Sequence, residues 1–291
     1  MSTVIWALSP HPPLLIPEVG GEALEQVRQT REGLEAVCRA VAESRPERLV
    51  LITPHGPVHP RAVPVFVVDR LTGNLGRFGH PEVTLGLDVD RALALALIRA
   101  AEERGVPVLA LDESLAASRQ VALELDHALM VPLYYLERAG VHVPAVVLSI
   151  SWLPEEEHVR LGEALRDVLR GCPHRVAVVA SGDLSHRLLD SGPYGFDEMG
   201  PVFDRRLLEL LEKTDPAGIL DLPEEMVERA GQCGVRPILT LLGSLEPGAQ
   251  ARIHSYEGPF GVGYAVAHFS LPETPVARPT PGDDPRSPDR V

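Results

Sequence analysis

Short apolar runs rich in valine alternate with long stretches of helical periodicity along most of this chain, and this alternation restricts the fold more than any other feature. Eight short runs predict β-strands over residues 3–8, 48–53, 62–68, 108–111, 145–150, 175–180, 251–256 and 261–267. Six longer stretches predict helices over residues 21–43, 88–104, 126–139, 155–170, 200–214 and 234–245. Several strands are apolar almost throughout, which is typical of strands buried on both faces. The pattern therefore predicts an α/β fold with a central mixed β-sheet flanked by helices on both faces.

The composition indicates how much of the chain belongs to that domain. Of the 291 residues, 45% are hydrophobic and 23% are charged, as in ordinary globular proteins. From about residue 272 onward the sequence is rich in proline and nearly free of apolar residues. We therefore expect one domain over residues 1–271 and a disordered proline-rich tail over residues 272–291.

Charge and cysteine content argue against several kinds of partner and compartment. The formal net charge is −14, whereas binding to nucleic acid or to an anionic membrane needs clustered lysine and arginine. The three cysteines, Cys38, Cys172 and Cys233, are widely spaced and form no disulfide framework, which fits a reducing compartment. The first apolar run is too short for a signal or membrane helix. These observations predict a cytoplasmic protein with no nucleic-acid or membrane partner, and a homodimer would be unsurprising.

Three of the eleven histidines directly follow predicted strands. His11 lies in SPHPP, His55 in TPHGP and His186 in SGDLSHRL. In open α/β sheets ligands bind outside the carboxyl ends of the strands, so the three imidazoles could converge on one pocket. Imidazole is a common ligand of divalent metals. Taken singly, His11 and His55 could also be loop residues beside turn-forming prolines. A separation above about 6 Å between their ring nitrogens would exclude a shared ion.

A fourth histidine stands at a predicted helix start. Asp126 is expected to cap the helix that His127 enters in its first turn, where the helix dipole disfavours a charged imidazolium. His127 would then be neutral and able to give or take a proton, although alone it could be a partly buried structural residue. Asp183 could orient His186 or cap a following helix. The other seven histidines are expected to be structural: His59, His80, His142, His158, His174, His254 and His268.

Five short motifs, taken in order, are similar to those of a known enzyme family. SPHPP, TPHGP, LDHALMVPL, SGDLSHRL and SYEGPFGVGYAVA occur here in the same order as in the class III extradiol ring-cleavage dioxygenases of the LigB type. The resemblance spans residues 3–270 and is closer to a branch related to Memo-type proteins. It implies a LigB-like α/β domain that acts in aromatic compound metabolism.

The resemblance also implies a cofactor, substrates and residue roles. Members of the family use a non-haem Fe(II) that binds a small aromatic diol and O2, and the ring is cleaved beside the diol. The two family histidines that bind iron match His11 and His55. The two that transfer protons match His127 and His186, which agrees with a facial metal triad that leaves positions open.

The third metal ligand departs from the family pattern. Where classical members have a glutamate, the comparable segment ERAGQCGVRPILTLLGSL contains Gln232 and Cys233. Memo-type proteins resemble this segment through Cys-Gly-x-x-Pro, and a cysteine ligand would shift the metal preference toward zinc or copper. Cys233 could equally be a small buried apolar residue. Glu257, in HSYEGPFGVGY, could complete the triad, bind a ligand histidine through a hydrogen bond, or do neither.

Three functions are compatible with these residues. The leading one is an Fe(II)-dependent extradiol dioxygenase that acts on a small catecholic compound. The alternative is a Memo-like metal-binding protein with a redox or protein-interaction role and no ring cleavage. A metal-dependent hydrolase is a third interpretation, which lacks the bridging carboxylate expected of a two-metal site.

Overall fold

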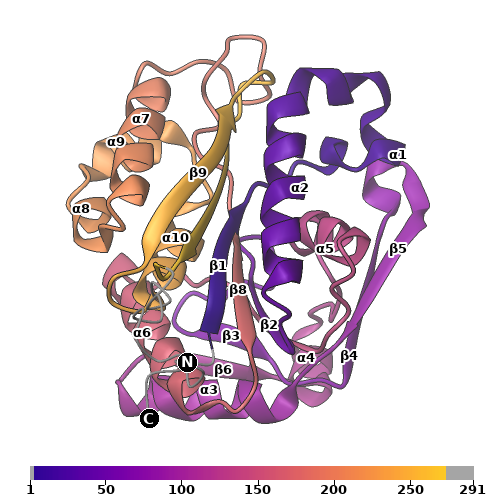
Figure 1. Ribbon diagram of the computed structural model, residues 1–291, viewed down its shortest axis with the longest axis vertical. Helices are drawn as coiled ribbons and strands as arrows, with labels where there is room; N and C mark the ends of the chain where they lie inside the picture. The colour runs from indigo at the N-terminus through magenta and orange to yellow at the C-terminus, as the bar shows by residue number, and fades with distance from the viewer. Residues whose placement is uncertain (1–2, 273–291) are drawn as a thin grey trace, which may run out of the picture.

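The computed structural model describes residues 3–272, and its centre is one eight-stranded mixed sheet (Figure 1). In spatial order the strands are β6 (Val108–Leu111), β3 (Val63–Phe66), β7 (Ala145–Leu148), β2 (Arg48–Ile52), β8 (Val176–Ser181), β1 (Thr3–Ser9), β10 (Tyr264–Ser270) and β9 (Gln250–Glu257). These are the eight strands that the sequence predicts, so the single α/β domain is confirmed. The tail expected over residues 272–291 lies, after Pro272, outside the described residues.

Strand direction divides the sheet into a parallel centre and antiparallel additions. β7, β2, β8 and β1 all run parallel to one another. β10 pairs antiparallel with β1 and β9 antiparallel with β10, while β3 is antiparallel to β7 and parallel to β6. The four central strands therefore end at the same edge of the sheet, which is where ligands bind in folds of this kind.

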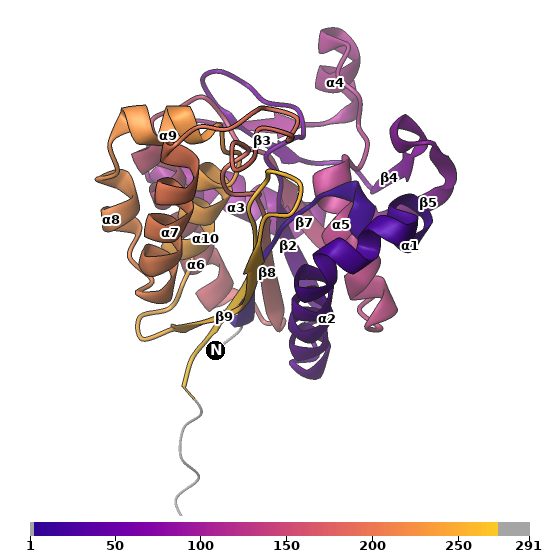
Figure 2. The same ribbon diagram turned by 90° about the horizontal axis from the view of Figure 1, so that it is seen from above.

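Helices cover both faces, as expected from the apolar strands (Figure 2). One face packs against α2 (Arg28–Glu43) and α5 (His127–Arg138). The other packs against α3 (Arg91–Glu103), α6 (Glu155–Gly171), α7 (Met199–Glu212) and α10 (Val235–Gly243). Shorter helical segments join these elements: η1 (Pro13–Leu15), α1 (Pro17–Gly20), η2 (Gly21–Val27), η3 (Gly76–Phe78), α4 (Glu113–Arg119), α8 (Pro216–Leu220) and α9 (Glu224–Ala230).

Each central strand contributes to two hydrophobic cores, because successive side chains point to opposite faces. In β1, Trp6 and Leu8 belong to the core beneath α6, α7 and α10, whereas Ile5 and Ala7 belong to the core beneath α2 and α5. All four side chains are at most 5% exposed. Burial on both faces is the physical reason that these strands lack the polar alternation of a one-sided sheet.

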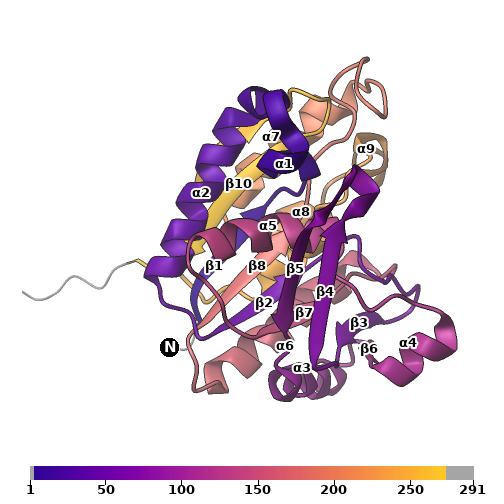
Figure 3. The ribbon, with the colours of Figure 1, turned by 90° about the vertical axis from the view of Figure 1, so that its right-hand side faces the viewer.

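A two-stranded hairpin, β4 (Arg70–Leu75) and β5 (His80–Asp88), was not expected from the sequence (Figure 3). Its burial alternates only weakly, and glycines interrupt its apolar pattern, so it gives little strand signal. Because β5 extends to Asp88, the helix expected from residue 88 begins instead at Arg91.

The helix expected over residues 21–43 is also shorter than predicted. Residues 21–27 form the 3-10 segment η2, and α2 begins only at Arg28. Gly21 has a positive φ of 47°, a value incompatible with a right-handed helix, and it follows directly on α1.

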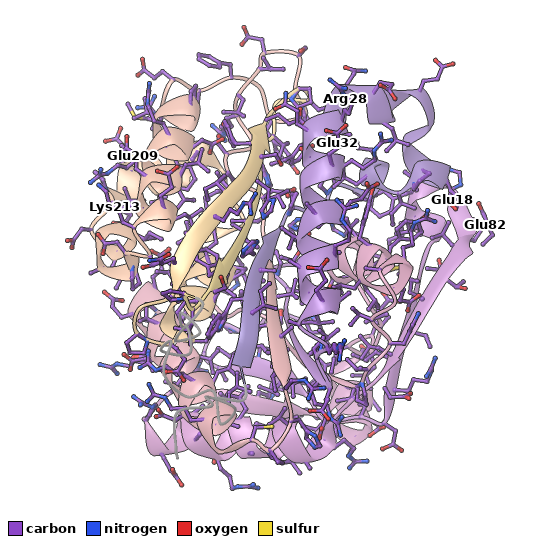
Figure 4. The ribbon with its side chains drawn as sticks, in the orientation of Figure 1. Glu18, Arg28, Glu32, Glu82, Glu209 and Lys213 are labelled. Atoms are coloured by element: carbon purple, nitrogen blue, oxygen red, sulfur yellow. The ribbon has the colours of Figure 1, made fainter. Side chains whose placement is uncertain are left out.

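The acidic balance of the chain is carried on its surface. Figure 4 labels charged side chains on α1, α2, β5 and the end of α7 that are all exposed to solvent: Glu18, Arg28, Glu32, Glu82, Glu209 and Lys213. Within residues 3–272, no helix combines the length and the apolar character needed to cross a membrane.

A candidate metal centre at the carboxyl ends of the parallel strands

The register of the parallel strands places the predicted histidines side by side. Ser9 at the end of β1 pairs with Ser181 at the end of β8, and Ile52 at the end of β2 pairs with Ala180. Strands β1, β2 and β8 therefore end at the same level, and the segments that follow them leave the sheet side by side. His11 follows two residues after Ser9, and His55 follows three residues after Ile52.

His11 and His55 point ring nitrogens at the same place. Their Nε2 atoms are 3.1 Å apart, and the rings meet edge to face with centroids 4.8 Å apart. The other ring nitrogen of His11, Nδ1, lies 3.0 Å from Oγ of Ser181. If Nδ1 carries the hydrogen and donates it to Ser181, the lone pair of Nε2 is free for a ligand. The pair therefore has the separation that a shared ion requires, well below the limit of about 6 Å.

Cys233 joins the two histidines from the segment between α9 and α10. Its Sγ lies 3.6 Å from His11 Nε2 and accepts a hydrogen bond of 3.4 Å from the backbone N–H of Asp183. Two glycines allow this approach: a Cβ on Gly182 would lie 2.6 Å from Gly234 Cα, and one on Gly234 would lie 2.7 Å from the carbonyl oxygen of Asp183. Because neither residue has a side chain, the Cys233 segment can pack directly on the end of β8.

The donor atoms fit a divalent transition metal. His11, His55 and Cys233 offer two nitrogens and one sulfur that all lie within 4.8 Å of one another. Two nitrogens bound at about 2.0 Å to one ion lie roughly 2.8–3.4 Å apart, and a nitrogen and a sulfur lie roughly 3.1–3.6 Å apart, over octahedral to tetrahedral angles. The distances of 3.1 and 3.6 Å lie within these ranges. Of the three candidates for the third ligand, Cys233 is therefore the one that lies beside His11 and His55.

Asp183 fixes the backbone of His11 beside the candidate metal centre. Its Oδ1 accepts a hydrogen bond of 3.0 Å from the backbone N–H of His11, and its Oδ2 lies 3.5 Å from His11 Nε2. Burial raises the pKa of this carboxyl to about 7, against the effect of that hydrogen bond. The next helix, α7, begins only at Met199, so the interpretation of Asp183 as a helix cap is wrong. Asp183 also forms a second group of potential ligands together with His186 and Cys233.

A small hydrogen-bond network positions His127. Asp126 caps α5 by accepting from the backbone N–H groups of Ala128 and Leu129, as the sequence predicts. The same carboxylate accepts from Oγ1 of Thr53, at 2.9 and 3.0 Å, and that oxygen accepts from the backbone N–H of His55. The start of α5 is thereby tied to the end of β2.

The result is that His127 stacks on His55, with ring centroids 4.8 Å apart and an interplanar angle of 20°. Burial, followed by repulsion from His55, lowers the pKa of His127 to about 4. His127 is therefore a neutral imidazole at pH 7, next to the candidate ligands.

His186 flanks the centre on the Cys233 side. Its Nε2 lies 3.7 Å from Cys233 Sγ, and its ring stacks on exposed Tyr194 with centroids 5.1 Å apart. Burial lowers the pKa of His186 to about 4. Burial also holds the pKa of His11 well below its usual value, as the neighbouring histidines do to a lesser extent. The centre thus contains neutral imidazoles, the form that binds metals.

The other two candidates for the third ligand have structural partners. Gln232 Oε1 accepts a hydrogen bond of 2.8 Å from the backbone N–H of Val235 at the start of α10. Glu257, at the end of β9, accepts from the backbone N–H and the hydroxyl of Thr30, at 2.7 and 2.6 Å. The Glu257 carboxylate therefore caps the first turn of α2 and belongs to neither of the two ligand groups found in residues 3–272.

Two cavities adjoin the centre. One of about 520 Å³ is lined by His55 and His127 together with Arg77 and Phe78 of the hairpin segment. The other, of about 330 Å³, is lined by His55, Gln232, Cys233, Trp152 and Arg236, among others. Sequence reasoning missed Arg77 and Phe78 because the hairpin was not expected. It missed Trp152 because this residue stands in no recognisable motif, and Arg236 because it occupies an unspecified position of Cys-Gly-x-x-Pro.

Fold and site together define an α/β protein with a candidate transition-metal centre of two histidines and a cysteine at the carboxyl ends of its parallel strands. The chain belongs to the LigB family, described as the catalytic LigB subunit of aromatic ring-opening dioxygenase, which matches residues 6–267. The family assignment made from the five motifs is thereby confirmed. The closer relation to Memo-type proteins stays a prediction.

Individual proteins of known sequence match this chain at low identity. The chain is 32% identical over 260 residues to Protein CA_C1420 of Clostridium acetobutylicum, an alignment covering 89% of this chain and 56% of that protein. It is 31% identical over 183 residues to a 2,3-dihydroxyphenylpropionate/2,3-dihydroxicinnamic acid 1,2-dioxygenase of Mycolicibacterium vanbaalenii, covering 60% of this chain and 54% of that enzyme. The matched part is thus about half the length of each of these relatives.

A solved structure shares the fold. The crystal structure of uncharacterized protein JW3007 from Escherichia coli K12 superposes with a TM-score of 0.62 at 17% sequence identity. The match covers 92% of this chain and 99% of that one, so the likeness extends over the whole domain.

Proposed function

We propose that this protein is a non-haem Fe(II)-dependent extradiol dioxygenase that cleaves the ring of a small aromatic diol with O2. The observation that carries the proposal is the convergence of His11 and His55, with Nε2 atoms 3.1 Å apart, between two further partly buried neutral histidines in a chain of the LigB family. The match to a dioxygenase of Mycolicibacterium vanbaalenii supports the same reaction class. A cytoplasmic location and a homodimer stay predictions of the sequence.

The residues around the candidate centre would have different roles in this reaction. His11, His55 and Cys233 would hold the metal, which supplies the redox chemistry that lets O2 react with a diol. His127 lines the 520 Å³ cavity as a neutral base and would take a proton from a diol hydroxyl. His186, beside Cys233, would return a proton later in the reaction. Asp183 positions His11 through the backbone hydrogen bond.

One observation favours a second function. The third donor is a thiol and not a carboxylate, and sulfur shifts the preference of a site from iron toward zinc or copper. A Memo-like metal-binding protein with a redox or protein-interaction role would use the same residues without cleaving a ring. The two functions would share these ligands and differ in whether the bound metal lets a catechol react with O2.

The experiment combines anaerobic Fe(II) loading with a panel of catechols. For a dioxygenase we expect O2 uptake and a yellow ring-opened product, and we expect Cys233→Asp, which restores a carboxylate donor, to keep turnover. Cys233→Ala should weaken metal binding under either function. The absence of O2 uptake with every catechol, in protein holding one iron per chain, would contradict the proposal and support the metal-binding function.

A further inference from the structure

The most deeply buried carboxylate among residues 3–272 has no role in the centre described above. Asp183 and Asp204 are the only acidic residues in this range that are buried, and Asp204, in the second turn of α7, is 0% exposed. Burial raises the pKa of Asp204 to about 6, against the effect of two hydrogen bonds, so the group is largely ionised at pH 7. A charge withdrawn from water lowers stability relative to an apolar side chain of similar size. Asp204 is therefore expected to do something that an apolar residue cannot.

The Asp204 carboxylate joins two segments that lie far apart in the sequence. Its Oδ1 accepts a hydrogen bond of 2.7 Å from the backbone N–H of Ser185, and its Oδ2 accepts one of 2.6 Å from the hydroxyl of Tyr256. A Cβ on Gly263 would collide with Oδ2, so this approach requires a glycine just before β10. Asp204 therefore links the segment after β8 to β9, which runs alongside α7 (Figure 1).

Ser185 directly precedes His186, and three groups from different elements hold it. The first is the Asp204 carboxylate on α7. The second is the carbonyl oxygen of Ala230 at the end of α9, which accepts from the Ser185 hydroxyl and from the backbone N–H of His186, both at 3.0 Å. The third is the backbone N–H of Gly263, which donates to the Ser185 carbonyl oxygen at 2.7 Å. Of the three groups, only Asp204 acts through a side chain, so only its contact can be removed by substitution.

The His186 ring depends on this support because its own contacts are weak. Its Nε2 lies 3.7 Å from Cys233 Sγ, and a thiol is a poor hydrogen-bond partner. Its other neighbour, the stacked ring of Tyr194, belongs to a residue that is 60% exposed, and exposed side chains change rotamer rapidly. The orientation of the imidazole is therefore set mainly by the backbone that carries it.

We propose that Asp204 is a positioning residue for His186: its carboxylate, oriented by Tyr256, fixes the Ser185 peptide group and thereby holds the His186 imidazole beside Cys233. Asp204 lines neither of the two cavities at the centre, so it acts through Ser185 and not by touching a substrate. The positioning rests on these contacts alone, whereas its effect on turnover rests on the proposed function.

The first measurement needs no enzyme activity. In metal-free protein that is isotopically labelled at Cε1 of its histidines, each imidazole gives one NMR resonance, and the resonance of His186 is assigned by its absence from His186→Gln. Asp204→Leu removes the acceptor and roughly keeps the volume. It should shift or broaden the His186 resonance and leave those of His55 and His127 unchanged.

Two matched variants show whether the acceptor is what matters. Asp204→Asn keeps an oxygen for Ser185, and its amide group can donate to the Tyr256 hydroxyl, so the His186 resonance should stay at its wild-type position. Leu210→Ala removes a buried side chain further along α7, where Leu210 packs against Gly218. This variant destabilises the helix without touching Ser185 and should also leave the His186 resonance in place.

The second measurement uses the Fe(II)-loaded protein and a catechol that it cleaves. In Asp204→Leu we expect kcat to fall by about 10–100-fold, the loss that follows removal of a supporting residue. KM and the iron content per chain should not change, because His11, His55 and Cys233 stay in place. Asp204→Asn and Leu210→Ala should keep most of kcat.

The outcomes separate the positioning role from the reaction. An unmoved His186 resonance in folded Asp204→Leu overturns the role, and so does an equal shift in Asp204→Asn or Leu210→Ala. Loss of iron in step with kcat also overturns it, because the substitution would then act on the metal ligands. A His186 resonance that moves as expected, in a protein that cleaves no catechol, supports the role and contradicts the proposed function.

A milder variant decides if Asp204→Leu does not fold. Tyr256→Phe removes only the hydroxyl that orients Oδ2 of Asp204, so it should shift the His186 resonance by a smaller amount. A His186 resonance at the wild-type position in this variant overturns the role.

Discussion

Within residues 3–272, two pairs of histidines approach within hydrogen-bond distance, and only one of them belongs to a group of three potential metal ligands. His11 and His55 meet beyond the ends of two parallel strands, with Nε2 atoms 3.1 Å apart. His254 and His268 meet across the antiparallel strands β9 and β10, with Nε2 and Nδ1 2.8 Å apart. In both pairs burial lowers the pKa values of the imidazoles.

The two pairs differ in the potential metal ligands that lie beside them. His11 and His55 are joined by Cys233, whereas no group of three potential ligands in residues 3–272 includes His254 or His268. Side chains on neighbouring strands meet mainly each other and, here, α2, whose Gly33 lies close to His254. Loops at strand ends can converge from several directions. Two close imidazoles alone are therefore a weaker indication of a metal site than two imidazoles with a third potential ligand from another segment.

The strongest test removes one member of each pair. His11→Ala and His55→Ala should weaken metal binding by more than about 100-fold, because each removes a direct ligand where loss of a supporting residue alone costs 10–100-fold. His254→Ala and His268→Ala should bind one metal per chain like the wild type. Metal content by mass spectrometry after saturation and desalting measures this. Equal loss in His254→Ala would contradict the distinction.

A second substitution separates proton transfer from metal binding. His127→Asn removes the base but no ligand, so kcat on a cleaved catechol should fall by about 10²–10⁴-fold while metal content stays unchanged. His268→Asn is the matched control and should keep full activity. A His127 variant that loses its metal in parallel with its activity would identify His127 as a ligand instead.

His127, beside the candidate centre, and His254, on β9, should affect the pH dependence of the protein's stability in the same way. The pKa values of His127 and His254 are both lowered to about 4, from about 6.5 in the unfolded chain. Between these pH values the unfolded chain binds a proton that the native protein does not, so stability falls as the pH drops from 6.5 to 4 and is unaffected above 6.5. Asp183, whose pKa is raised to about 7, acts in the opposite sense between pH 7 and 4.

Below pH 6.5 the free energy of unfolding of the metal-free protein should therefore fall less steeply in His127→Asn and in His254→Asn. In each variant unfolding takes up as much as one proton fewer than in the wild type. Urea unfolding at pH 7.0, 5.5 and 4.5 measures the slope. The wild type, His127→Asn and His254→Asn should all gain strong extra acid sensitivity when zinc is added, because protons compete with zinc for the imidazole ligands His11 and His55. Zinc without effect in the wild type would contradict a site at His11 and His55.

The smallest effect is expected at Glu257, which lies on the same antiparallel edge. Glu257→Gln keeps an acceptor for Thr30 but loses its charge, so the free energy of unfolding should fall by about 1 kcal/mol. Metal binding should not change. Thr30→Val, which removes only the hydroxyl partner, should act similarly, and a loss of metal in either variant would place Glu257 at the centre after all.

Local patterns determined much of this structure. The eight strands follow from runs of apolar residues, since burial on both faces leaves few other choices. His11, His55 and His186 could be selected because parallel strands must end at one edge, and Asp126 was recognisable as a cap in front of His127. The weak hairpin β4–β5 was missed, because its glycines interrupt the alternation on which strand prediction depends.

The positions of the other residues around the centre depend on contacts between segments distant in sequence. Cys233 reaches His11, 222 residues away, because Gly182 and Gly234 pack backbone against backbone. Glu257 instead caps α2 through Thr30. Arg236 borders the centre because α10 follows Cys233 directly. Sequence periodicity reports which face of an element is buried, and so it determined the sheet and the edge where the histidines stand. It carries no information on which loops approach one another across that edge, so the position of the third donor, Cys233, was decided by the tertiary structure alone.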